Sequence, residues 1–173
     1  MIPFAPNIQH TREIIKTPDF CFTGKQLART IIAGDRYLSV PVVGGSSHCK
    51  RPVLSDSLVI SNHGRWREEH LGAWSATYGK TPFFPYIFPE LERVYIENSH
   101  TTLEEFNNSI FQIAVSFLSP SLLIPSLVSL KASNPMRYSE IKREYEGKVN
   151  LNYSIFDALF RLGRNSIWVC LEE

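Results

Sequence analysis

Residues 60–84, ISNHGRWREEHLGAWSATYGKTPFF, form the stretch around which the rest of the chain is expected to be organised. Turn-forming residues open and close it, which predicts a helix of about fifteen residues. Within it, aromatic and imidazole side chains recur at spacings of three or four and so share one face of the helix. The members of this stripe are His63, Trp66, His70, Trp74 and Tyr78. Each has a polar atom, whereas a stripe made only for the core would more often be aliphatic.

The composition is that of an ordinary soluble globular protein and favours no charged partner such as nucleic acid. The chain has 173 residues, 43% of them hydrophobic and 20% charged, with a formal net charge of +1. Such a balance gives no support to nucleic-acid binding. The apolar region 114–130 is interrupted by two prolines, so no membrane insertion is expected. The three scattered cysteines suggest reduced thiols in a cytoplasmic protein.

Short β-rich segments alternate with helical patterns along the chain. A capping box at Thr102 and Glu105, followed by apolar residues at helical spacing, predicts a helix from residue 103. A second cap at Ser154 predicts a short helix that Gly163 ends. A further helix, with Pro89 in its first turn, is expected through residues 90–95, and a polar surface loop with some helical turn over 133–147. Strands are expected at residues 2–6, 19–23, 37–43 and 58–61, the last two as a hairpin, and β-like structure over 121–130.

His70 is the best candidate for acid–base chemistry. A histidine placed on a helix between two tryptophans can hold its pKa near neutrality and exchange a proton with a substrate. The alternative is a buried histidine that only supports aromatic packing. Asp157 could orient His70 if its helix packs nearby, although its simplest role is to cap the helix that begins after Ser154.

Basic residues at two places could bind an anion. His63 and Arg67 lie four residues apart at the start of the central helix, and Lys25 and Arg29 have the same spacing further upstream. Guanidinium and ammonium groups in such pairs suit phosphate or carboxylate, although solvated pairs of this kind are common. A single His48–Cys49 pair is weak evidence for a metal, so no metal site and no cofactor is predicted.

Three blocks of this sequence, taken together, resemble the WbqC-like protein family, in particular its shorter members from Bacteroidetes-type bacteria. The first is KQLARTIIAGDRYLSVPVVG, at residues 25–44. The second is the central stretch, through Trp66, Arg67, His70, Tyr78 and the Pro-Phe-Phe at residues 82–84. The third is NYSIFDALF, at residues 152–160. The chain departs from longer members near residues 2–6, where it has no histidine.

The resemblance implies an α/β fold, which agrees with the alternation of strands and helices. We therefore expect a mixed β-sheet flanked by helices in a single domain over residues 1–173, with an α+β arrangement as the alternative. The resemblance also implies a bacterial protein of surface-polysaccharide (O-antigen type) biosynthesis. The activity it suggests is acyl or aminoacyl transfer to an amino sugar carried on a nucleotide.

Two classes of function follow from these residues. In the first, the protein is a transferase that binds a nucleotide-sugar-like small molecule. Its catalytic residues would be His70, Tyr78 and Asp157, and its substrate-binding residues Lys25, Arg29, His63, Trp66, Arg67 and Trp74. In the second, it is a non-catalytic sugar- or protein-binding module, and the stripe is core or a surface on which sugars stack. Burial of Trp66 and Trp74 favours the core, whereas a cleft position favours a ligand.

Overall fold

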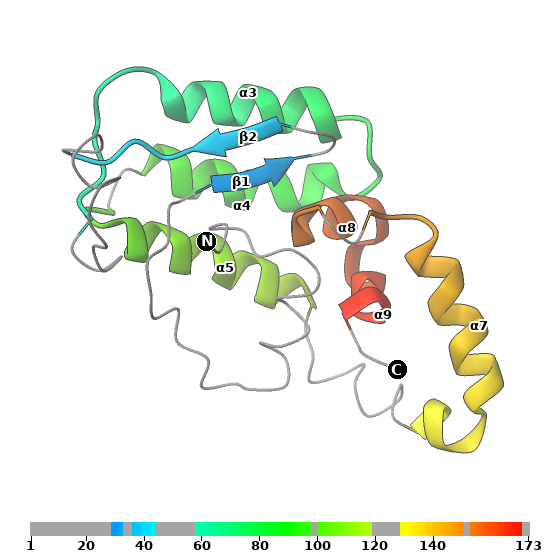
Figure 1. Cartoon of the computed structure of the whole chain (residues 1–173). Coiled ribbons are helices and arrows are strands. Elements are labelled where there is room, and N and C mark those ends of the chain that lie inside the picture. Colours follow the sequence, from blue (N-terminus) through cyan, green and yellow to red (C-terminus); the bar gives the residue numbers. More distant parts are fainter. Residues whose placement is uncertain are drawn as a thin grey trace.

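The computed structural model describes residues 29–32, 36–43, 58–97, 100–118, 129–150 and 153–170. These residues are mostly helical (Figure 1). The helices are α3 (Trp66–Tyr78), α4 (Phe84–Ile96), α5 (Leu103–Leu118), α7 (Pro135–Glu146), α8 (Ile155–Leu162) and α9 (Ile167–Cys170), with the 3-10 helix η2 (Gly163–Ser166). Residues 129–133 are also helical. The strands are β1 (Arg29–Ile32) and β2 (Arg36–Ser39).

The expected mixed β-sheet flanked by helices is wrong. In the described residues β1 and β2 pair with each other as a two-stranded antiparallel hairpin, with Arg29 opposite Ser39. Beyond it, two isolated antiparallel bridges join Val42 to Ile60 and Val59 to Thr102. The β-branched residues around position 40 therefore form extended backbone without building a sheet, because helices supply the surface that covers them. The strands expected at residues 2–6 and 19–23 lie outside the described residues.

The central helix is confirmed as α3, and it packs on α4, which in turn contacts α5 and α8. Figure 1 shows these helices as a stack, with α8 and α9 at one end and α7 beyond them. Their facing sides form one hydrophobic core. The largest fully buried side chains in it are Trp74, Tyr78, Tyr95, Phe106, Phe156 and Phe160. None of the helices in the described ranges combines the length and apolar character needed to cross a bilayer.

Two other helices differ from the expected boundaries. α4 begins at Phe84, with Pro85 in its first turn, and Pro89 lies inside it. An internal proline removes one backbone hydrogen bond, which α4 tolerates because its apolar face is buried in the core. Residues 133–147, expected as a loop, contain α7, whose cap Asn134 accepts a hydrogen bond from the Arg137 N–H at 3.1 Å. Its polar composition had concealed the helix.

The capping box of α5 is confirmed. The Glu105 N–H donates to the Thr102 hydroxyl at 3.2 Å, and the Glu105 carboxylate accepts from the Thr102 N–H at 3.0 Å and the Thr101 N–H at 2.9 Å. These backbone donors, Thr102 first and then Thr101, lower the pKa of Glu105 below its ordinary value. The box fixes the start of α5 at the end of the Val59–Thr102 bridge.

Thr102→Ala is expected to lower the free energy of unfolding by about 1 kcal/mol, because the Glu105 N–H loses its acceptor. The pKa of Glu105 is lower in the folded than in the unfolded chain, so its ionised carboxylate stabilises the fold. This stabilisation is complete above the unfolded pKa and is lost as the pH falls through the folded pKa. Urea unfolding of both proteins at neutral and acidic pH measures these effects. Thr102→Ser keeps the hydroxyl and should stay close to the native chain; an equal loss in Thr102→Ser would contradict the capping explanation.

Candidate functional site

The predicted stripe is a real face of α3, and it is turned into the core. Trp66, His70, Trp74 and Tyr78 are all buried, with exposed fractions of 7%, 4%, 0% and 0%. His63 does not belong to this face. It lies in the loop before α3 and is exposed, because the helix begins only after Arg65.

His70 and Tyr95 form a buried polar pair between α3 and α4. The His70 Nδ1 lies 3.3 Å from the Tyr95 hydroxyl oxygen, and the two rings meet edge to face. Burial raises the pKa of Tyr95, an effect that the nearby Trp74 N–H and then the Arg67 charge partly oppose. The indole N–H of Trp74 lies near this hydroxyl without the geometry of a hydrogen bond. Tyr95 is therefore a neutral phenol that fixes one ring nitrogen of His70.

Arg67 is a half-buried cation beside this pair. Its guanidinium lies 4.3 Å from the centre of the Trp66 ring, and its Nε is buried with no hydrogen-bond partner. Desolvation lowers the pKa of Arg67, and the proximity of Tyr95 partly offsets this decrease. Among the ion pairs of the described residues, none neutralises this charge. A desolvated guanidinium with an unused donor is suited to an anionic ligand, because a buried donor without an acceptor is unfavourable.

The other predicted catalytic and binding residues have their main contacts elsewhere, although the Trp74 indole N–H also lies near the Tyr95 hydroxyl. Trp74 and Tyr78 pack against Phe160 of α8, with ring centres 5.8 Å and 4.8 Å away. Asp157 is buried on α8, and its Oδ1 accepts a hydrogen bond from the Arg161 Nε at 3.0 Å. Tyr95 of α4, rather than Asp157, is thus a hydrogen-bonding partner of His70. Arg29 is the first residue of β1, and Lys25 lies outside the described residues.

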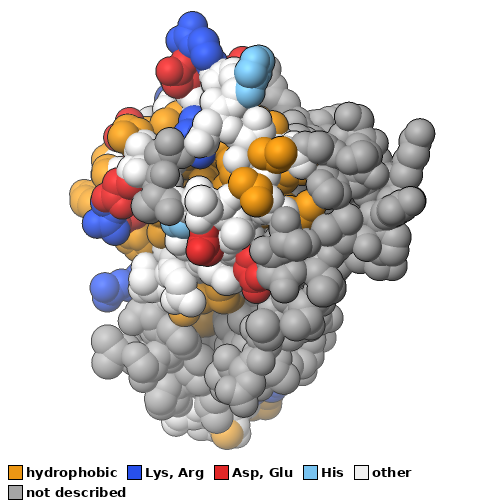
Figure 2. Space-filling model, turned by 90° about the vertical axis from the view of Figure 1, so that its left-hand side faces the viewer, with side chains coloured by type: hydrophobic (Ala, Val, Ile, Leu, Met, Phe, Trp, Pro, Cys, Tyr) orange, Lys and Arg blue, Asp and Glu red, His pale blue; other side chains and the backbone are white. Residues whose placement is uncertain are grey.

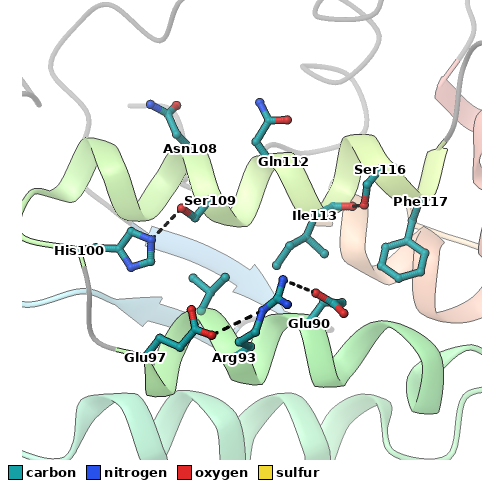
Figure 3. Close-up of a pocket in the computed structure, with 11 residues that line it drawn as sticks. Glu90, Arg93, Glu97, His100, Asn108, Ser109, Gln112, Ile113, Ser116 and Phe117 are labelled. Atoms are coloured by element: carbon teal, nitrogen blue, oxygen red, sulfur yellow. Dashed lines mark hydrogen bonds and ion pairs between the residues drawn. The ribbon is translucent and has the colours of Figure 1, made fainter.

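A groove between α4 and α5 was not anticipated from the sequence (Figure 3). Its volume is about 730 Å³, within the usual size range of ligand sites. On the α4 side, Arg93 is paired with Glu90 at 2.6 Å and with Glu97 at 3.8 Å. On the α5 side, the His100 Nε2 lies 2.7 Å from the Ser109 Oγ. No sequence motif marks this pair, because its members are nine residues apart and meet only once α5 is folded.

On the part of the surface that the structure describes, charges of both signs are mixed, so they form no single-sign patch that would attract a charged ligand from a distance. Figure 2 shows basic and acidic side chains next to one another on the described part of one face, in keeping with the net charge of +1. Within the described residues, no three His, Cys, Asp or Glu side chains come together as ligands for a metal ion.

Comparison with protein families identifies the chain. The model of the WbqC-like protein family matches residues 24–154, about three quarters of the sequence. The chain belongs to the WbqC-like protein family. The resemblance of the sequence blocks is thus confirmed. No curated protein and no solved structure matches the chain.

The matched range of this WbqC-like protein contains both candidate places. Arg67, His70 and Tyr95 lie inside it, and so do the His100–Ser109 pair and the groove. Asp157 lies just beyond its end. The part of the chain that is related to the family is therefore sufficient to form the group around His70.

Proposed function

We propose that this WbqC-like protein takes part in surface-polysaccharide biosynthesis of the O-antigen type. It would transfer an acyl or aminoacyl group to an amino sugar carried on a nucleotide. The observation that carries the proposal is Arg67, a half-buried guanidinium without an ion-pair partner in the described residues, next to the buried His70–Tyr95 pair. Arg67 would bind the phosphate or carboxylate of the ligand, and His70 would lie close to the reacting amine.

In the reaction, the sugar amine attacks the acyl carbon of an activated donor such as a thioester. A new C–N bond forms and the C–S bond breaks. His70 takes the proton that the amine loses and returns it to the departing thiolate, which balances the step. The Tyr95 hydroxyl, 3.3 Å from Nδ1, would hold the His70 ring in position during this transfer. Arg67 would also supply N–H donors to the oxyanion of the tetrahedral intermediate.

A non-catalytic binding module of the same family is the second candidate. Complete burial of Trp74 and Tyr78 favours it, because both rings serve the core and neither offers a face to a sugar. His70 itself is only 4% exposed. In this alternative Arg67 still binds an anionic group, and the His70–Tyr95 pair holds α3 against α4 without moving a proton.

Thermal unfolding with a panel of nucleotide sugars and acyl-CoAs tests the binding step. A ligand at a hundred times its Kd should stabilise the folded chain by about 2.7 kcal/mol and raise the Tm. We expect such a shift with at least one nucleotide sugar, and its loss in Arg67→Ala. Arg65→Ala is the matched control, since Arg65 is exposed and paired with Glu68. A flat response to the whole panel, or an equal shift in Arg67→Ala, would refute an anion site at Arg67.

The ligand found in this way separates the two candidates. The nucleotide sugar is incubated with acyl thioesters and the native chain or His70→Gln, and products are followed by mass spectrometry. A transferase gives acylated sugar with the native chain and little with His70→Gln, while the Tm shift persists in both. A native chain that binds the sugar but forms no product with any thioester supports the binding module.

A further inference from the structure

The groove between α4 and α5 contains a serine hydroxyl and an imidazole at hydrogen-bond distance. The His100 Nε2 and the Ser109 Oγ are 2.7 Å apart, and Figure 3 shows both on the side of α5 that faces α4. A hydroxyl within reach of an imidazole nitrogen is the arrangement by which a serine becomes a nucleophile. The pair lines a space of about 730 Å³, so a small molecule can approach it.

The backbone holds His100 in place relative to Ser109. Directly after His100, the Thr101 carbonyl accepts a hydrogen bond from the Ile60 N–H at 2.9 Å, and Thr102 bridges to Val59. The His100 ring also packs edge to face on Phe106, one turn before Ser109 on α5. Ser109 thus belongs to α5, and His100 directly precedes bridged backbone, so both sides of the contact are held by the fold.

A second serine in the same groove shows how an ordinary helical serine behaves. Ser116 also belongs to α5 and lines the groove, but its hydroxyl donates to the Ile113 carbonyl of its own helix at 2.8 Å. The Ser109 Oγ instead lies 2.7 Å from the His100 Nε2. Only Ser109 is therefore placed to lose its proton to a base, and Ser116 serves as an internal comparison.

We propose that Ser109 is a nucleophile activated by His100, which accepts an acyl group from a carboxylic ester or thioester bound in this groove. The Ser109 Oγ forms a bond to the acyl carbon while its proton passes to the His100 Nε2. The C–O or C–S bond of the donor then breaks, and its leaving group takes that proton. Arg93 also lines the groove (Figure 3), and it would donate to the intermediate oxyanion by exchanging its contact with Glu90 or Glu97. This inference does not rest on the proposed function, which uses Arg67 and His70.

Phenylmethanesulfonyl fluoride tests the reactivity of Ser109 without knowledge of the substrate. The full chain is treated with the reagent, and intact mass and peptide mapping locate the adduct. We expect one sulfonyl group on Ser109, none there in Ser109→Ala, and at least tenfold slower labelling in His100→Gln. Ser116→Ala should label as fast as the native chain. Absence of an adduct on Ser109, or the same rate in His100→Gln, would overturn the proposal.

A second variant keeps the test decisive if Ser109→Ala or His100→Gln unfolds the chain. Ser109→Cys places a thiol at the same position, and its alkylation by iodoacetamide reports the same activation. With His100 present, the introduced thiol should react at least tenfold faster than the thiol of Ser116→Cys, measured in the folded protein under the same conditions. Equal rates at the two positions would show that His100 activates nothing and only anchors the loop to α5.

Discussion

Trp74→Ala is expected to lower the free energy of unfolding by about 3–5 kcal/mol, the largest effect of any substitution in the stripe. The Trp74 side chain is completely buried, and its ring contacts Tyr78 on α3 and both Phe156 and Phe160 on α8. Removing the indole leaves a cavity where α3 meets α8, and the surrounding aromatic rings cannot close it without losing their own contacts.

Urea unfolding followed by circular dichroism measures this loss, with Tyr86→Ala as the control. Tyr86 is an aromatic residue of α4 that is 71% exposed, so its removal should change stability by less than about 0.5 kcal/mol. The same experiment tests the assignment of Trp74 as a substrate-binding residue. If Trp74→Ala keeps native stability but abolishes the ligand-induced Tm shift, Trp74 belongs to a ligand site rather than to the core.

The sequence was sufficient for those helices whose signals are local. α5 could be predicted because its capping box and its apolar periodicity lie within a few residues, and α8 because Ser154 and Gly163 mark its two ends. α7 was missed for the opposite reason: it buries only Tyr138 and Lys142, so no apolar periodicity revealed it. The sheet was expected from the family resemblance and from the alternation of β-rich and helical segments, and neither determines whether a strand finds partners.

Only the α3 residues of the candidate site could be predicted from the sequence. The polar-aromatic spacing of α3 singled out Trp66 and His70, and the basic pair at its start singled out Arg67. The partner of His70 could not be found in this way, because Tyr95 is distant in sequence and reaches His70 only when α4 packs on α3. The His100–Ser109 pair depends in the same way on the bridge that anchors the backbone after His100. Contacts between residues of different helices or loops follow no fixed spacing in the sequence, so only the folded structure reveals them.

Gly163→Ala is expected to lower the free energy of unfolding by about 2–5 kcal/mol, the second large effect. Gly163 ends α8 with φ 57° and ψ −133°, a backbone conformation that L side chains rarely adopt. A Cβ at this position would also lie 2.6 Å from the Phe83 ring. Backbone strain of about 1–2 kcal/mol adds to an overpacking penalty of about 1–3 kcal/mol, because Phe83 is packed against the core.

Gly72→Ala is the matched control, since it makes the same change in the middle of α3. A Cβ at Gly72 meets nothing within 4 Å, so alanine should stabilise the helix by about 0.5–1 kcal/mol. Repeating Gly163→Ala in a Phe83→Ala background then separates the two penalties, because the smaller side chain removes the clash and leaves the strain. If Gly163→Ala alone does not change the free energy of unfolding, residue 163 does not have the positive φ described here. In that case the Phe83 ring does not lie against it either.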